Sequence, residues 1–419
     1  MNAAELESLA KRRADREKEF TDVVNDPLRT PVVNPENSEQ ASPVSGFGEK
    51  SEVEIQRERE RKPRIACLGP LTGELEHYGQ ETLHGAELAS EELDAAGGVK
   101  GVEYELMIID SQGSIAGTQA AIETLLEHNV LAIVGAGTGE VSFAANKMIN
   151  EYQLIKMSAG SRRRLGDTGP YNYRNSLDDN HAIVRLVDYL KKEKGWKRFA
   201  LFSSVVNDYS VQLSAHFKGA LLNAGLAVSH ELYYWGAPMA NMEADETSID
   251  AQVQSLVASP PDAVIFTGGP EEAIEVVNAM RAHKLTIPLV GSEDIDTPEF
   301  GALGRKALST IIYGGFNKDS SNPGVKRFVE AYTKRFGSPP SRLAALSYDS
   351  FNILVEATRR APSLRPSHVR QALGGIKGYQ GVTGPTTINE TGESLKDPFI
   401  FEFQKAGSQY RFVNVREPF

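Results

Sequence analysis

The sequence contains one cysteine in 419 residues, Cys67, so it can form neither a disulfide framework nor a cluster of thiolate metal ligands. It has no run of 18 or more apolar residues, and we therefore expect no membrane-spanning helix. The formal net charge is −11, and no long basic stripe interleaved with aromatic residues occurs in the part expected to fold, so nucleic acid is not an expected partner. Cys67 lies in a short apolar run, which predicts a buried structural thiol.

The chain also lacks the short motifs of common catalytic sites. There is no Gly-x-x-x-x-Gly-Lys-Ser/Thr, no His-Glu-x-x-His and no Gly-x-Ser-x-Gly, and the eight histidines lack metal-ligand spacing. Residues 135–140, Gly-Ala-Gly-Thr-Gly-Glu, superficially resemble a dinucleotide fingerprint, but no acidic residue ends a strand about 20 residues later. We therefore expect a non-enzymatic protein with no metal and no cofactor. A nucleotide-dependent enzyme that uses the glycine-rich loops is the catalytic alternative.

The first 62 residues differ in composition from the rest. Residues 1–20 lack the apolar core that a secretory signal peptide requires, and residues 21–62 are rich in proline, serine and mixed charge. Such a segment buries too little apolar surface to offset the entropy of ordering, so we expect 1–62 to be a mostly disordered, charged extension. It is either a solvated tail or a segment that docks or tethers a partner.

The folded part begins with a strand, a polar loop and an amphipathic helix. Residues 65–68 are an apolar run that ends at Gly69, which is typical of a buried parallel strand. The helix that follows has one apolar stripe, and Gly97-Gly98 predicts its left-handed end. The stripe consists of Leu83, Ala86, Ala89 and Leu93. Ligands of open α/β sheets sit beyond the carboxyl ends of the strands, so Thr72 and Tyr78 are placed to contact one.

Strand and helix patterns then alternate in two similar series, which predicts parallel sheets covered on both faces. The first series has strands at 104–109, 131–134 and 154–156 and helices at 116–127 and 142–151. The second begins near residue 197, with strands at 199–202, 226–233, 262–266 and 288–290 and helices at 211–223, 249–258 and 271–283. A strand at 310–313, helices at 323–336 and 343–360 and strands at 399–404 and 410–415 complete the chain.

Four short motifs in register point to a known family. They are Gly69-Pro70-Leu71-Thr72-Gly73, Tyr78-Gly79, Gly85-Ala86-Glu87 and Gly97-Gly98-Val99-Lys100-Gly101. In this order and spacing the chain resembles the type I periplasmic binding proteins, most closely the binders of branched-chain amino acids and amides. The resemblance continues more thinly to the C-terminus, and so covers about 64–419.

The resemblance implies a particular α/β fold, with two doubly wound, Rossmann-like lobes joined by a three-segment hinge. We expect the three crossovers near Asn175, Gly314 and Pro398. Lobe 1 then comprises 63–175 and 315–397, and lobe 2 comprises 176–314 and 398–419.

The candidate site in lobe 1 would hold a ligand carboxylate, for which free amides at a helix N-terminus and small hydroxyls are suitable partners. By resemblance, the loop Ser158-Ala159-Gly160-Ser161 and the positions Thr138 and Gly139 contact the carboxylate, and Tyr78 lines the same lobe. Gly160 stands where the family has a threonine, and Ser161 could replace that hydroxyl. The alternative is that this loop is only a tight turn into a helix.

The candidate site in lobe 2 would hold a ligand ammonium. Glu293 follows a strand and matches the family's Gly-x-Glu motif, and Tyr209 matches the aromatic residue that closes over the ligand. The alternative for Glu293 is an exposed loop carboxylate. Arg162-Arg163-Arg164 are either solvated or supply one guanidinium to an anionic ligand group, which would favour a dicarboxylate or acidic solute.

Function follows from the resemblance. The chain is expected to bind an amino acid or related small polar solute between its two lobes, without catalysis, and to present it to an ABC transporter permease. We expect a monomer that acts in the periplasm or outside the cytoplasm. The missing signal peptide keeps open a second hypothesis, a cytoplasmic amide or amino-acid sensor that regulates a partner protein.

Overall fold

The computed structural model describes residues 62–128, 130–135, 139–160, 168–205, 207–235 and 248–419, with the backbone alone for 139–144. The predicted extension 1–62 therefore lies almost entirely outside the described residues. The chain divides into two compact units, each treated separately below. The first unit contains the described residues up to Asn175, with 346–376 and 388–393; the second contains 176–345, 377–387 and 394–419.

This division shares its first boundary, after Asn175, with the lobes expected from the sequence. It differs at the later boundaries, because residues 315–345, 377–387 and 394–397 fall in the second unit rather than in the first. Helix α11 (Pro323–Phe336), expected in the first lobe, is therefore part of the second unit. Its buried Phe328 packs edge-to-face on Phe316, which follows the last parallel strand of that unit.

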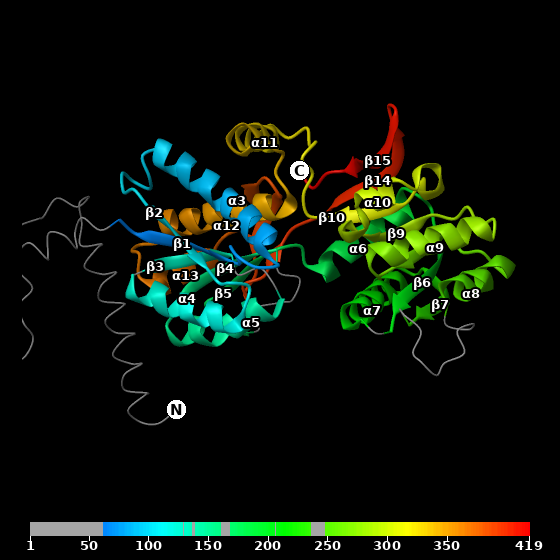
Figure 1. The fold of residues 1–419 in the computed structure, drawn as a ribbon, viewed down its shortest axis with the longest axis horizontal. Helices are drawn as coiled ribbons and strands as arrows, with labels where there is room; N and C mark the ends of the chain where they lie inside the picture. The colour runs from blue at the N-terminus through cyan, green and yellow to red at the C-terminus, as the bar shows by residue number, and fades with distance from the viewer. Residues whose placement is uncertain (1–61, 129, 136–138, 161–167, 206, 236–247) are drawn as a thin grey trace, which may run out of the picture. The chain divides into compact units, whose positions relative to one another are not determined.

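The first unit is a five-stranded parallel sheet in the order β2-β1-β3-β4-β5. Its strands are β1 (Arg64–Gly69), β2 (Glu105–Asp110), β3 (Val130–Gly135), β4 (Ile155–Ala159) and β5 (Asn172–Asn175). Its helices are α3 (Glu76–Ala95), α4 (Ile115–Glu127), α5 (Gly139–Glu151), α13 (Pro366–Gly374) and most of α12 (Arg342–Arg360). Helices α3 and α12 lie on one side of the sheet and α4 and α5 on the other (Figure 1).

The glycine motifs of the first unit have clear structural causes. Gly97 and Gly98 end α3 with φ of 80° and 74°, in the left-handed region predicted for them. A Cβ on Gly98 would lie 2.0 Å from the Val102 carbonyl oxygen, so the turn into β2 excludes any side chain there. Cys67 on β1 is fully buried, as predicted, and burial raises the pKa of its thiol to about 12.

The second unit is a seven-stranded sheet in the order β15-β14-β10-β9-β8-β6-β7. Its parallel strands are β6 (Arg198–Ser204), β7 (Ala227–Tyr234), β8 (Ala263–Phe266), β9 (Leu289–Ser292) and β10 (Ile311–Gly314). Two antiparallel strands, β14 (Phe399–Ala406) and β15 (Gln409–Arg416), extend the sheet as a long hairpin (Figure 1). A small sheet is formed by β11 (Tyr379–Gly381), β12 (Gly384–Ile388) and β13 (Ser394–Leu395).

Two apolar cores cover the two faces of the larger sheet. One core contains Phe202 and Phe266 and packs against α8 (Ile249–Ser255) and α9 (Pro270–Ala282). The other contains Phe199 and packs against α6 (Asp179–Lys192) and α7 (Asp208–Asn223). The short helix η2 (Leu256–Ala258) follows α8, and η3 (Glu293–Ile295), α10 (Pro298–Gly301) and η4 (Gly304–Ala307) lie between β9 and β10. Because neighbouring residues of a strand point to opposite faces, each strand serves both cores.

The predicted α/β fold class is confirmed, but the sequence analysis missed one structurally important helix. It placed the start of the second series near residue 197, whereas α6 already begins at Asp179. The helix has an N-cap at Asp178, whose carboxylate accepts a hydrogen bond from the His181 amide. Among the described residues, no helix is long and apolar enough to cross a membrane.

Candidate functional site

The loop after β1 is held in place by Asp110, the last residue of the neighbouring β2. Its carboxylate accepts hydrogen bonds from the Leu71 amide at 2.8 Å, the Thr72 hydroxyl at 2.6 Å and the Gln112 amide at 2.7 Å. Burial opposes ionisation of Asp110, but these hydrogen bonds outweigh it and lower its pKa. Thr72, expected to contact a ligand, therefore has its hydroxyl engaged in ordering the loop.

Tyr78 lies in the first turn of α3, directly after this loop. Its side chain is 42% exposed, and its ring lies 3.8 Å, centroid to centroid, from that of His77. The neighbouring Gly79 is needed for close packing, since a Cβ there would lie 2.0 Å from the Pro70 carbonyl oxygen. The Tyr78-Gly79 pair thus has two roles: the glycine lets the loop approach the helix, and the tyrosine presents an exposed ring beside the loop.

The predicted serine loop begins at the carboxyl end of β4. Ser158 and Ala159 are fully buried in that strand, and Gly160 follows with φ of 89°, which favours glycine. Among the described residues, the Ser158 hydroxyl oxygen has no hydrogen-bond partner. A buried hydroxyl without a partner is uncommon in folded proteins, and it marks the end of β4 as a place where a polar group can be received.

Several predicted positions cannot be placed. Thr138, Ser161 and the arginines 162–164 lie outside the described residues. Gly139 is the first residue of α5, so its amide is one of the helix N-terminal amides that lack an intrahelical acceptor. This end of α5 follows β3, the strand next to β4, and therefore lies at the same sheet edge as Ser158.

A buried polar cluster extends from Ser158 into the first unit, on the same face of β4. Lys156 is fully buried and its ammonium donates to Asn146 Oδ1 at 2.6 Å. Burial lowers the pKa of Lys156 to about 7. Asn172 lies on β5 opposite Lys156 of β4, and its Nδ2 donates to the Asn146 carbonyl oxygen at 3.5 Å. The cluster is too deeply buried to meet a solute directly, and it makes this half of the sheet unusually polar.

In the second unit, Glu293 begins the turn η3 at the end of β9. Its Oε2 accepts the Gly315 amide at 2.8 Å, and its Oε1 lies 3.0 Å from Nε of Arg342. Glu293 is only 21% exposed, so it is not the solvated loop carboxylate of the alternative hypothesis. Both carboxylate oxygens are already in contact with donors of the same unit.

Tyr209 occupies in the second unit the place that Tyr78 has in the first, at the start of the helix after the first strand. Asn207 caps α7, and the Tyr209 hydroxyl donates to Asp179 Oδ2 at 3.0 Å. The Tyr313 hydroxyl donates to the other oxygen of the same carboxylate, also at 3.0 Å. Asp179 thus fixes the position of Tyr209 relative to the end of β10.

Three residues beside the candidate site were not predicted: Asp110, Asp179 and Arg342. Asp110 ends a strand and could have been found, because a carboxylate at the carboxyl end of a buried strand is a common site signal. Asp179 required recognition of α6, whose start is marked by Asp178-Asp179. No sequence signal pairs Arg342 with Glu293, since 49 residues separate them.

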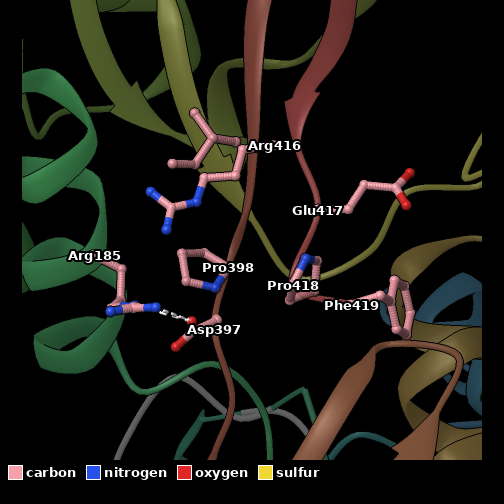
Figure 2. Close-up of a pocket in the computed structure, with 8 residues that line it drawn as sticks. Arg185, Asp397, Pro398, Arg416, Glu417, Pro418 and Phe419 are labelled. Atoms are coloured by element: carbon pink, nitrogen blue, oxygen red, sulfur yellow. Dashed lines mark hydrogen bonds and ion pairs between the residues drawn. The ribbon is translucent and has the colours of Figure 1, made fainter. Parts of the chain in front are cut away.

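A separate pocket lies in the second unit, and none of the predicted residues lines it. Its volume is about 210 Å³, and its lining includes Arg185, Asp397 and Arg416. Figure 2 shows the Arg185 guanidinium directed at Asp397, which it contacts at 2.5 and 2.9 Å. Burial opposes ionisation of Asp397, but hydrogen bonds from His181 and Arg185 outweigh it and lower its pKa. The described residues contain no group of three or more His, Cys, Asp or Glu that could hold a metal ion.

Comparison with known proteins identifies the family. The family model described as periplasmic binding protein matches residues 62–408, which include most of both units. This chain belongs to the periplasmic binding protein family. The predicted resemblance and the solute-binding character that it implied are therefore confirmed.

Individual relatives are distant in sequence and similar in fold. The Leu/Ile/Val-binding protein homolog 3 of Brucella melitensis is 23% identical over 346 residues, covering 81% of this chain and 90% of the relative. An ABC transporter substrate-binding protein of Desulfitobacterium hafniense, solved in complex with leucine, has a TM-score of 0.68 and 20% identity, covering 84% and 100% of the two chains. A solute-binding protein of Rhodopseudomonas palustris, solved with 3,4-dihydroxybenzoic acid, has a TM-score of 0.63 and 20% identity, covering 84% and 96%.

Proposed function

We propose that this chain binds a small solute that carries a carboxylate, either an amino acid or a related acid, and delivers it to an ABC transporter permease. The observation that carries the proposal is the family match over 62–408, because it includes both α/β units rather than one. The two structural relatives support the ligand class: leucine and 3,4-dihydroxybenzoic acid share a carboxylate and differ in nearly everything else.

The first unit would hold the carboxylate. Its candidate contacts lie at the carboxyl edge of one parallel sheet: the N-terminus of α5 at Gly139 and the loop Ser158-Ala159-Gly160. Helix N-terminal amides and small hydroxyls stabilise an anion through the helix dipole and direct hydrogen bonds. The buried Ser158 hydroxyl, which has no partner among the described residues, supports this choice. Thr138 and Ser161 stay in the proposal from the resemblance alone.

The remaining contacts would come from two tyrosines and one acid. Tyr78 and Tyr209 each stand in the first turn of a helix at the carboxyl end of the first strand of their unit. Glu293 follows β9 in the same position relative to its sheet. The proposed ligand set is therefore Tyr78, Thr138, Gly139, Ser158, Ala159, Gly160, Ser161, Tyr209 and Glu293.

The partner and the compartment are part of the same proposal. We propose a permease partner, a monomeric state, a role outside the cytoplasm and no catalysis, and membership of the family supports this proposal. The sensor hypothesis would require a cytoplasmic partner protein, and the relatives do not favour it. A titration with NAD, followed by fluorescence, tests the enzymatic alternative, and saturable binding would support it.

A thermal-shift screen of the full chain tests the proposal most directly. The compounds are the branched-chain, acidic and aromatic amino acids, their 2-oxo acids, dicarboxylates, benzoic acids, amides and urea. A ligand at 100 times its Kd stabilises the native state by about 2.7 kcal/mol, which gives a clear increase in Tm. We expect at least one carboxylate to raise Tm and neutral amides of the same size not to do so. No response to any carboxylate, or an equal response to the amides, would overturn the proposal.

A further inference from the structure

The Glu293–Arg342 ion pair bears on which solute the second unit accepts, and the inference drawn from it rests on the proposed function. By resemblance, Glu293 is the anchor for a ligand ammonium. In this structure its Oε1 lies 3.0 Å from Arg342 Nε, and its Oε2 accepts the Gly315 amide at 2.8 Å. The carboxylate is therefore partnered by two donors of its own unit, one of which carries a full positive charge.

The residues around the Glu293–Arg342 pair leave space for it and fix the position of one partner. A Cβ on Gly314 would lie 2.8 Å from Glu293 Oε2, so a side chain at that position would push the carboxylate away. A Cβ on Gly315 would lie 3.5 Å from Cδ of Arg342, an ordinary contact distance, so the arginine stem runs close beside the backbone that follows β10. Arg342 is the first residue of α12, which fixes its backbone. Gly314, the last residue of β10, thus leaves the space in which the Glu293 carboxylate meets Arg342.

The pair changes the charge that an incoming ligand meets. An unpaired carboxylate attracts an ammonium, whereas a carboxylate bound to a guanidinium is close to neutral, and an ammonium must compete with Arg342 for it. Arg342 has five N–H donors, and its contact with Glu293 is the one ion pair or hydrogen bond of the guanidinium among the described residues. Its side chain is 29% exposed, so the guanidinium is not sealed in the core, and a planar guanidinium suits a planar anion.

We propose that Arg342 is a specificity-determining residue and that the site prefers a carboxylate-bearing solute without an ammonium, such as a 2-oxo acid, a dicarboxylate or an aromatic acid. The guanidinium occupies Glu293 and offers its free donors to a carboxylate, carbonyl or hydroxyl oxygen of the ligand. An α-amino acid would bring its ammonium next to an arginine whose charge is only partly offset. An ammonium on the solute, the group that Glu293 was predicted to bind, therefore lowers its affinity.

Matched pairs of compounds test this preference in the full chain by isothermal titration calorimetry. The pairs are leucine with 4-methyl-2-oxopentanoate, phenylalanine with phenylpyruvate and glutamate with 2-oxoglutarate, so that each pair differs mainly in the ammonium. We expect the oxo acid of the best-binding pair to bind the unmodified chain at least tenfold more tightly. In Arg342→Gln this ratio should fall at least tenfold, because Glu293 is released and the guanidinium is lost.

Two further variants make the outcome decisive. Arg342→Lys keeps a charge without the planar fork and should give an intermediate ratio; it also provides the test if the glutamine variant does not fold. Arg411→Gln is the matched control, since it breaks an exposed ion pair with Asp319 in the same unit and should leave the ratio unchanged. Tighter binding of the amino acid, or an unchanged ratio in both Arg342 variants, would overturn the inference but not the proposed function. Binding of none of the six compounds would also overturn the inference, whereas the proposed function fails separately, if no carboxylate of the thermal-shift screen raises Tm.

Discussion

Each unit contains an ion pair between residues that are distant in sequence, and the two pairs differ in how deeply they are buried. In the first unit, Arg174 on β5 pairs with Glu393, and both side chains are 1% exposed. In the second unit, Glu293 and Arg342 are 21% and 29% exposed. Transfer of two charges out of water is costly, and their attraction offsets the cost only if both partners remain. Loss of one partner should therefore destabilise the first unit strongly, whereas the second pair is exposed enough for the proposed ligand to compete with one partner.

Removal of one partner from the buried pair of the first unit should have the largest effect on stability. Glu393→Ala leaves the Arg174 guanidinium buried without its counter-ion, and we expect a loss of about 3–5 kcal/mol in the free energy of unfolding, measured by urea denaturation. Asp319→Ala, which breaks the exposed pair with Arg411, is the control and should cost no more than about 1 kcal/mol. Similar costs for the two variants would show that water reaches Arg174 in the native state.

A second test concerns the buried charge next to that pair. The folded-state pKa of Lys156, about 7, lies below its ordinary value of 10.5, so between these pH values the unfolded chain binds more protons than the native one. Stability that is lost at pH 7 should therefore return as the pH rises toward 10.5. Lys156→Met removes the buried ammonium, and we expect it to raise the free energy of unfolding at pH 7 by about 1–3 kcal/mol.

The same variant also allows the pH dependence of the free energy of unfolding to be measured. The difference between Lys156→Met and the unmodified chain, from urea denaturation at pH 7, 8, 9 and 10, should shrink steadily as the pH rises. Lys326→Met removes an exposed lysine from α11 and should show no such trend. If Lys156→Met destabilises the chain equally at every pH, the hydrogen bond to Asn146 outweighs the cost of burying the charge, and the polar cluster is held together by Lys156.

The sequence predicted well where strands end and the next helices begin, because local residue patterns determine these positions. Apolar runs that stop at a glycine or at a polar loop, followed by helical periodicity, correctly predicted β1 with α3 and β6 with α7. These same patterns could not predict the later division of the chain. Residues 315–345 contain a well-formed helix, α11, but which unit it packs on depends on tertiary contacts such as Phe328 with Phe316.

The partners of the candidate site residues could not be predicted for a similar reason. A position after a strand predicts that Glu293 and Tyr209 lie at the carboxyl edge of a sheet, and the structure has both there. The ion pair of Glu293 with Arg342 and the hydrogen bond of Tyr209 to Asp179 join segments that are distant in sequence, so no local spacing encodes them. Whether the nine predicted residues bind a ligand stays a prediction, and two of them, Thr138 and Ser161, lie outside the described residues.

The comparison extends to the two tyrosines that occupy equivalent places in the two units. Tyr78 is 42% exposed, and among the described residues its hydroxyl donates no hydrogen bond, so its role should be contact with the ligand. We expect Tyr78→Ala to weaken the best ligand of the thermal-shift screen at least tenfold, or about 1.4 kcal/mol, in calorimetric titrations. Tyr233→Ala is the control, because Tyr233 is 45% exposed on β7 and outside the proposed ligand set. Equal affinities of the two variants would remove Tyr78 from the site.

Unlike Tyr78, Tyr209 donates a hydrogen bond from its hydroxyl, to Asp179. Removal of the hydroxyl alone tests the role of this hydrogen bond. Tyr209→Phe and Tyr313→Phe each remove one donor to Asp179, so both should cost about 0.5–1.5 kcal/mol in the free energy of unfolding. Tyr313 is buried, whereas Tyr209 is partly exposed at the start of α7. If Asp179 holds Tyr209 in position for the ligand, ligand affinity should fall a few-fold in Tyr209→Phe and stay within error in Tyr313→Phe. An equal fall in ligand affinity in both variants would mean that the ligand depends on Asp179 itself rather than on the Tyr209 ring.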